Sequence, residues 1–191
     1  MCMDLKIIKE YIQNKTICDI KSAVIIDNRE YTFSQQEIPK MMLSMVLPDG
    51  MDIMNSYSIK IKFPDENRPD VILALSDDDT INFMFSSIEE DVFEEDLQNI
   101  LQGILMVLKR MHSGATFYQT GNIQSELSNI WWFDYSTAAL DDDIYNIMYV
   151  LCLNGILIIG GFCCLQKFRK QWKPLVLQML ETVTRREENV K

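Results

Sequence analysis

The stretch Ile144–Gln166 reads IYNIMYVLCLNGILIIGGFCCLQ and contains no charged residue. An apolar run of about 20 residues is long enough to cross a bilayer as a helix, so a membrane span has to be considered first. However, Asn154-Gly155 lies at its middle, and this pair favours a two-residue hairpin turn because both residues tolerate positive φ. β-branched and aromatic residues dominate on both sides of the pair, as in strands. We therefore predict a buried β-hairpin and no membrane segment.

Both faces of this hairpin are apolar, whereas a strand with one face in water would be polar at every second residue. A hairpin of this kind belongs at the centre of a sheet that is covered on both sides. The predicted fold class is therefore α+β: an α/β/α sandwich with a central antiparallel sheet covered by helices on both faces.

Two long amphipathic helices are predicted to supply the cover. Residues 91–112 carry apolar side chains at intervals of three and four, beginning with Phe93, and residues 166–185 do the same with Pro174 inside. Acidic residues at the start of the first helix and Lys109 and Arg110 at its end suit the helix dipole.

The remaining segments complete the predicted order. Residues 3–15 are predicted to form a short amphipathic helix and residues 18–33 a hairpin with a polar turn. Further strands are expected at residues 41–47, 71–75, 80–88, 115–120 and 128–137, with a loop over residues 51–70 that holds a helical turn near 57–62. We expect one domain over residues 1–191, in which residues 1–40 form an N-terminal helix plus hairpin extension.

The charge of the chain restricts its partners. The formal net charge of −10 disfavours nucleic acid and anionic lipid, which bind through Lys and Arg, and suits a protein partner, particularly a basic one. The five cysteines have neither a C-x-x-C nor a zinc-site spacing, and because Met1-Cys2-Met3-Asp4 lacks a basic region followed by an apolar one, we expect no secretory signal here. We expect reduced thiols and a cytoplasmic location.

Catalytic and metal chemistry find little support in the sequence. His112 is the only histidine and falls at the expected end of a helix, where capping explains it without a role as general base. The triplets Asp77–Asp79 and Asp141–Asp143 lack the ligand spacing of a calcium loop and are expected to be solvated turns. We expect no catalytic residue, no metal and no cofactor, and hence a protein that is not an enzyme.

The run Trp131-Trp132-Phe133-Asp134-Tyr135 is the most informative candidate for binding. In a strand, Trp132 and Asp134 point to one face while their neighbours point to the other. The tryptophans could simply pack under the two helices. Alternatively, one of them lines a groove, since exposed aromatic side chains are enriched at binding sites.

A series of motifs resembles the PsbP-like superfamily, in particular its bacterial cytoplasmic proteins. The motifs are Leu47-Pro48-Asp49-Gly50, Ile61-Lys62-Phe63-Pro64, Glu66-Asn67-Arg68-Pro69, Ile81-Asn82-Phe83, Trp132-Phe133-Asp134, Asp143-Ile144-Tyr145-Asn146 and Trp172-Lys173-Pro174. The resemblance covers residues 41–184 and implies an antiparallel sheet between helices. It also implies protein binding without a shared catalytic site. It places the loop at Asn67-Arg68 beside Trp132, so Trp132, Asp134, Asn67 and Arg68 are the candidate binding residues.

Three hypotheses of function follow from these observations. The first is a non-catalytic protein–protein interaction module. The second is an acidic chaperone or immunity-type protein that sequesters a basic secreted partner. The third is a small-ligand-binding protein or enzyme with a pocket near Trp132. The sequence does not indicate the oligomeric state.

Overall fold

A computed structural model describes residues 18–66, 68–75, 78–89, 91–139 and 141–186. The helix predicted at residues 3–15 lies outside the described residues. The elements are β1 (Val24–Ile26), β2 (Arg29–Tyr31), β3 (Phe33–Glu37), β4 (Leu43–Pro48), β5 (Met51–Ile53), α2 (Ser56–Lys62), β6 (Val71–Leu75), β7 (Asp78–Ile88), η1 (Glu94–Asp96), α3 (Leu97–Met111), β8 (Thr116–Gln124), β9 (Asn129–Thr137), β10 (Ile144–Leu153), β11 (Ile156–Leu165), η2 (Gln166–Phe168), α4 (Arg169–Glu181) and β12 (Thr184–Arg185).

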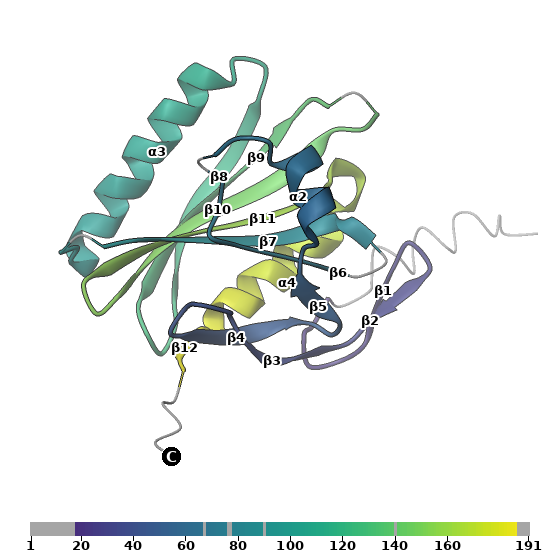
Figure 1. Cartoon of the computed structure of the whole chain (residues 1–191), viewed down its shortest axis with the longest axis horizontal. Helices are drawn as coiled ribbons and strands as arrows, with labels where there is room; N and C mark the ends of the chain where they lie inside the picture. The colour runs from purple at the N-terminus through teal and green to yellow at the C-terminus, as the bar shows by residue number, and fades with distance from the viewer. Residues whose placement is uncertain (1–17, 67, 76–77, 90, 140, 187–191) are drawn as a thin grey trace, which may run out of the picture.

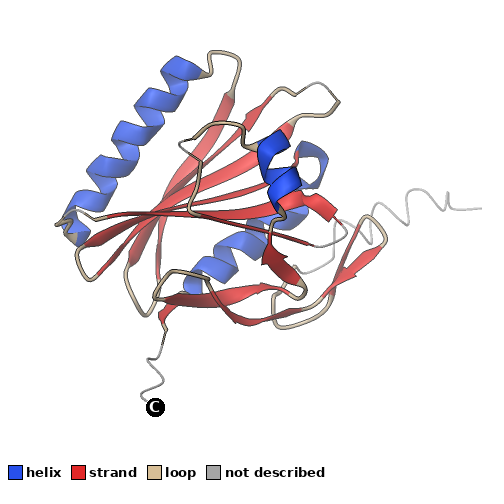
Figure 2. Cartoon of the chain, viewed as in Figure 1, coloured by secondary structure: helices blue, strands red, loops and turns tan. Residues whose placement is uncertain are grey.

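The uncharged run forms the hairpin of β10 and β11, as predicted. Asn154 and Gly155 make its turn with φ angles of 52° and 85°, the left-handed values that this turn requires. The hairpin lies inside a seven-stranded antiparallel sheet with the order β5-β6-β7-β11-β10-β9-β8 (Figure 2). Among the residues described, no helix combines the length and the apolar character needed to cross a bilayer.

Alternate residues of the central strands belong to two different hydrophobic clusters. Val150 of β10 packs in a cluster with the buried leucines of α3, while the preceding Tyr149 belongs to the cluster that contains Trp172 and Leu175 of α4. Successive residues of a strand point to opposite faces, so Val150 and Tyr149 connect β10 to two different clusters, one containing α3 and the other containing α4, which lie at separate places beside the large sheet (Figure 1). A mixed α+β chain built on antiparallel sheets is therefore confirmed.

A second sheet, with the order β12-β4-β3, adds a feature that the sequence did not predict. Alternate residues of β4 (Leu43, Met45 and Leu47) are buried in the same cluster as the apolar face of α4. Helix α4 thus contacts both the large and the small sheet. Strand β3 lies within the segment expected to be an N-terminal extension, and its pairing with β4 ties that segment to the rest of the chain.

The structure also corrects the start of the helix predicted at residue 91. Helix α3 begins at Leu97, after the 3-10 turn η1, and Phe93 has extended backbone angles (φ −104°, ψ 156°). The backbone N–H of Val92 donates to the carbonyl of Gly155 at 2.9 Å, which holds this segment against the β10–β11 turn. A tertiary hydrogen bond therefore overrides the local helical pattern.

Candidate binding site

The residues singled out from the sequence lie in two separate places. Trp132 and Asp134 point from β9 to the face covered by α4, as their spacing predicts, and both are buried. Arg68 is exposed in the loop before β6, and β7, β11 and β10 separate β6 from β9 in the sheet. Asn67 lies outside the described residues. The structure thus joins Trp132 to Asp134 but does not bring Arg68 to them.

Asp134 has a fully buried side chain at the centre of a polar cluster. Its Oδ2 accepts hydrogen bonds from Tyr145 Oη at 2.9 Å and from Lys173 Nζ at 2.7 Å, and it lies 3.5 Å from an Arg169 guanidinium nitrogen. Its Oδ1 accepts from the backbone N–H of Gln119 at 2.8 Å. Both carboxylate oxygens are therefore occupied by groups of the chain itself.

A bulge in β8 creates part of this cluster. Phe117 pairs with Tyr135 and Thr120 pairs with Phe133, so Tyr118 and Gln119 both lie opposite Asp134. The guanidinium of Arg169 lies 3.5 Å from the centre of the Tyr118 ring, a cation–π contact. The bulge and α4 together enclose the carboxylate.

Two aromatic side chains of the cluster, Tyr145 and Trp132, contact its charged groups without carrying a charge themselves. Burial, followed by the nearby Asp134 carboxylate, raises the pKa of Tyr145 well above its ordinary value, so its hydroxyl stays a hydrogen-bond donor. Lys173 Nζ lies 4.9 Å from the centre of the Trp132 ring. The cluster joins β9, β10 and α4 as a structural connection.

The space beside Asp134 is small. A cavity of 110 Å³ is lined there by Leu105, Lys109, Phe117, Tyr118, Gln119, Thr120, Phe133 and Asp134. Its volume is well below the roughly 300 Å³ of ordinary ligand pockets. Trp132 is not among the lining residues.

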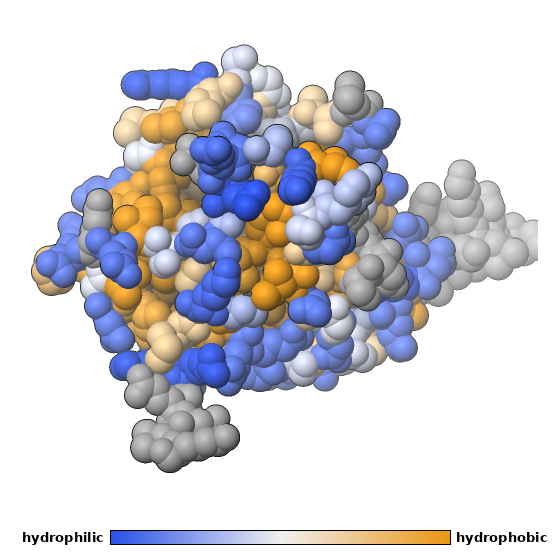
Figure 3. All heavy atoms as spheres, in the orientation of Figure 1, coloured by the Kyte–Doolittle hydropathy of each residue, from blue (hydrophilic) through white to orange (hydrophobic). Residues whose placement is uncertain are grey.

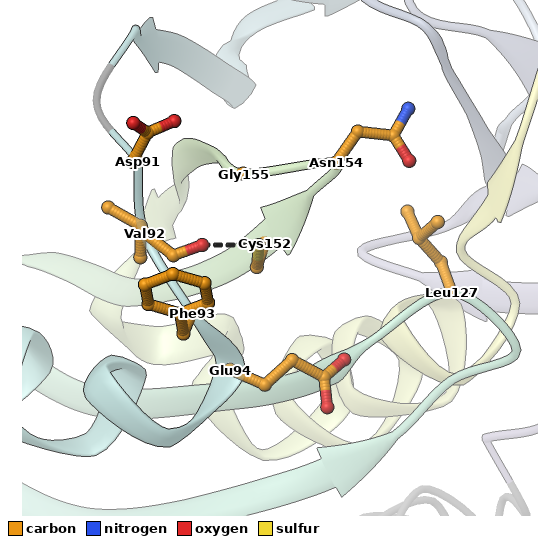
Figure 4. A pocket seen from close by; sticks show the side chains of 8 residues that line it. All are labelled: Asp91, Val92, Phe93, Glu94, Leu127, Cys152, Asn154 and Gly155. Atoms are coloured by element: carbon orange, nitrogen blue, oxygen red, sulfur yellow. Dashed lines mark hydrogen bonds between the residues drawn. The ribbon is translucent and has the colours of Figure 1, made fainter.

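A larger hollow opens at the end of the sheet where the β10–β11 turn lies (Figure 4). Its volume is 330 Å³, and its lining residues are Asp91, Val92, Phe93, Glu94, Leu127, Cys152, Asn154 and Gly155. We call it the end pocket. None of these residues was a candidate from the sequence, because the pocket forms from three segments far apart in the chain.

The wall of the end pocket is the extended segment that replaces the predicted first turn of α3. The Val92 side chain is buried in the cluster under α3, and the Cys152 thiol donates to the Val92 carbonyl at 3.2 Å. Phe93, the next residue, is 63% exposed. In Figure 4 Asp91, Val92, Phe93 and Glu94 follow one another along one side of the hollow, while Leu127 lies on the opposite side.

The charged side chains that line the end pocket are all negative. Its lining contains the two carboxylates of Asp91 and Glu94 and no Lys or Arg. A neighbouring hollow of 560 Å³ shares Leu127 and is lined in addition by Gln35, Ser44, Glu126, Thr184 and Arg185. The β8–β9 turn therefore stands between two adjoining depressions, of which the end pocket is acidic and partly apolar.

The cysteine pair and the histidine lie on β11 and at the end of α3. Cys163 and Cys164 are free thiols on successive positions of β11, and burial raises the pKa of each. His112 is exposed and ends α3, with its backbone N–H bonded to the carbonyl of Leu108. Within the described part of the chain, no group of three or more His, Cys, Asp or Glu side chains is arranged to hold a metal ion.

The fold has recognisable counterparts among solved structures. The chain is similar to the cyanobacterial PsbP protein (CyanoP) of Synechocystis sp. PCC 6803, with a TM-score of 0.59, 12% identity, and coverage of 85% of this chain and 97% of that one. The chain has a PsbP-like fold. It is also similar to LpqN of Mycobacterium tuberculosis, with a TM-score of 0.50, 12% identity, and coverage of 94% of this chain and 97% of that one. No family model and no curated protein matches the sequence.

The comparison confirms the resemblance found in the sequence at the level of fold. At 12% identity the shared architecture carries no information about which residues bind or what they bind. Function therefore has to be inferred from the surface of this chain.

Proposed function

We propose that this chain is a non-catalytic protein-interaction module: an α/β/α sandwich in a single domain, with residues 41–184 as its PsbP-like core, that binds a basic segment of a partner protein at the end pocket. The observation that carries the proposal is the exposed ring of Phe93 in a pocket whose lining also holds the carboxylates of Asp91 and Glu94. An exposed aromatic side chain in a hollow is typical of binding sites.

The chemistry of the pocket specifies the class of segment. Phe93 and Leu127 offer an apolar contact, which suits an aromatic or aliphatic side chain. The carboxylates of Asp91 and Glu94 suit Lys or Arg residues that flank it, and the net charge of −10 attracts a basic partner over a longer range. We therefore expect an apolar residue flanked by basic residues.

The wall of the end pocket supports a binding role and offers no support for a catalytic one. Cys152 is the one thiol in the lining, and its hydrogen is donated to the Val92 carbonyl. A thiol held in this way maintains the position of the wall.

We propose the cytoplasm as the location, and the free thiols of Cys18, Cys152, Cys163 and Cys164 support it.

Sequestration of a basic secreted partner is a special form of this proposal and is favoured by the same acidic lining. It requires a stoichiometric complex with a whole protein, whereas an interaction module requires only a segment. The binding of a small ligand near Trp132 and Asp134 remains a separate prediction, supported only by the 110 Å³ cavity.

The test is an amide NMR titration of the full chain with synthetic ten-residue peptides. One peptide alternates Lys with Phe and Leu, a second replaces Lys by Glu, and a third replaces Phe and Leu by Ser. We expect the first peptide alone to shift the amides of residues 91–94, 127 and 152–155. Shifts that map to another surface, or equal binding of the acidic peptide, would refute the proposal.

A charge-reversal pair supplies the matched control. Asp91→Lys with Glu94→Lys should abolish binding of the basic peptide. Glu30→Lys with Glu66→Lys changes the net charge by the same amount at exposed positions outside the pocket lining and should retain most of it. An equal loss in both variants would assign the binding to overall charge and exclude a specific site.

A further inference from the structure

The outer face of α3 carries three residues at intervals of seven: Asp96 at its N-cap, Gly103 and Arg110. Seven residues make almost two turns of an α-helix, so these positions fall on one narrow stripe of the helix. The buried residues Leu97, Leu101 and Leu105 face the sheet, which places the stripe on the exposed side. Arg110 makes no ion pair with any described residue.

Nothing in the described part of the chain explains the glycine at position 103. A Cβ added to it would meet no heavy atom of the described residues within 4 Å, and its φ is not positive, so neither packing nor backbone conformation there requires glycine. Glycine is among the poorest helix formers in a helix interior. Its usual benefit at such a position is that another backbone can approach closely.

Apolar side chains flank the glycine on the same side of the helix. Met106 is 57% exposed and Val107 is 52% exposed, and the side chain of Ile100 is half-buried. Figure 3 shows apolar side chains along α3 among hydrophilic ones. The stripe is thus an apolar centre with an acidic residue at one end and a basic residue at the other.

We propose that two copies of this chain associate through α3, with the helices antiparallel and the two-fold axis at Gly103. Asp96 and Arg110 are each seven residues from Gly103, so this axis places Asp96 of one copy opposite Arg110 of the other, twice. The contact is isologous and closes on itself, as a two-fold interface must.

The geometry of helix pairs is consistent with this arrangement. Packed helices lie 8–10 Å apart depending on the side chains at the contact, and glycine at the crossing allows the close end of this range. Asp96 and Arg110 are roughly 10 Å from the crossing along the axis, at 1.5 Å per residue. At the shallow crossing angle of about 20° the two helices stay close enough there for the side chains to meet.

The charge pattern selects a second copy over other partners. A purely basic partner would be repelled at Arg110 and a purely acidic one at Asp96. A surface that presents the same pattern in the reverse direction satisfies both ends, and an antiparallel copy of α3 is such a surface. Phe93 and the end pocket precede this stripe, so the two proposals rest on different residues.

The experiment is sedimentation velocity of the full chain across a range of concentrations at low and high salt. We expect a monomer–dimer equilibrium that weakens as salt rises, because the end contacts are exposed ion pairs. Arg110→Glu should weaken the dimer by about 30-fold, because it converts two exposed ion pairs into two like-charge repulsions. Gly103→Leu should abolish the dimer.

Gly103→Leu also separates assembly from folding, since leucine is a better helix former than glycine and the position is open. The variant should melt no lower than the wild-type monomer. Gln102→Leu, an exposed residue on another side of the same helix, is the matched control and should leave the dimer intact. A chain that is monomeric throughout, or a dimer indifferent to both Gly103→Leu and Arg110→Glu, overturns this proposal and leaves the peptide-binding proposal unaffected.

Discussion

The ammonium group of Lys173 lies 2.7 Å from the carboxylate of Asp134, which has no exposed side-chain surface. Lys173 itself is only 15% exposed, and Arg169 approaches the same oxygen. Removing one member of a buried pair leaves the other charges without their partner, which costs more than the pair contributes.

Asp134→Asn is therefore expected to destabilise the fold by about 3 kcal/mol, measured by urea unfolding. The control is Glu37→Gln, which removes a surface ion pair with Arg186 at 2.9 Å and should cost less than about 1 kcal/mol. Equal effects of the two substitutions would contradict the structural role assigned to the Asp134 cluster.

A second expectation concerns Gly160, which pairs with Tyr149 across β11 and β10. A Cβ on Gly160 would overlap with Cε2 of the Tyr149 ring. Gly160→Ala should cost about 2 kcal/mol or more, as overpacking does in a tight core. Gly114→Ala, where a Cβ meets no described atom within 4 Å, should change stability very little. Both variants are to be compared with the wild type by thermal unfolding.

A partner substitution tests the cause of the Gly160 effect. Combining Gly160→Ala with Tyr149→Leu removes the ring that the new methyl group would meet. The double variant should lose less stability than the sum of the two single variants. Strict additivity would show that the two residues do not interact.

Features that depend on residues close together in the sequence were predictable, whereas features that depend on contacts between distant residues were not. The β10–β11 hairpin was predictable because Asn154-Gly155 specifies its turn locally and the flanking residues are strand formers. The hairpin of β1 and β2, with Asp27 and Asn28 at positive φ, was predictable for the same reason.

The candidate sites depend on contacts that no local pattern records. Lys173 is 39 residues from Asp134, and nothing in the sequence near either residue indicates the pair. Phe93 matched the apolar spacing of a helix, yet Val92 is held by the carbonyl of Gly155 and the helix starts later. The exposed ring of Phe93 and the end pocket therefore depend on the tertiary contacts of Val92, of which this hydrogen bond is one.

Alkaline pH should destabilise the fold through buried groups that are neutral when protonated. Burial, with a smaller effect of Cys163, raises the pKa of Tyr135 to about 12, and burial raises the pKa of Cys164 above its ordinary value. The unfolded chain releases these protons at lower pH than the folded chain, so stability is complete below the ordinary thiol and phenol pKa values and falls above them.

We therefore expect the free energy of unfolding to be level near pH 7–8 and to decrease from about pH 9 through about pH 12. Absorbance at 295 nm should show that Tyr135 ionises only above the ordinary range for tyrosine. A stability that stays level over this interval would show that these side chains ionise at their ordinary pKa values and are therefore solvated in the folded chain.

The last expectation separates the two neighbouring residues that form the wall of the end pocket. Val92 is buried under α3, so Val92→Ala should cost about 2 kcal/mol in urea unfolding through lost burial. Phe93 is 63% exposed, and Phe93→Ser should change stability by no more than about 0.5 kcal/mol. The same Phe93 variant should lose binding of the basic, apolar peptide, because the ring is the apolar contact of the pocket. If Phe93→Ser instead unfolds the chain as much as Val92→Ala does, the ring is part of the core and the binding role of the end pocket is wrong.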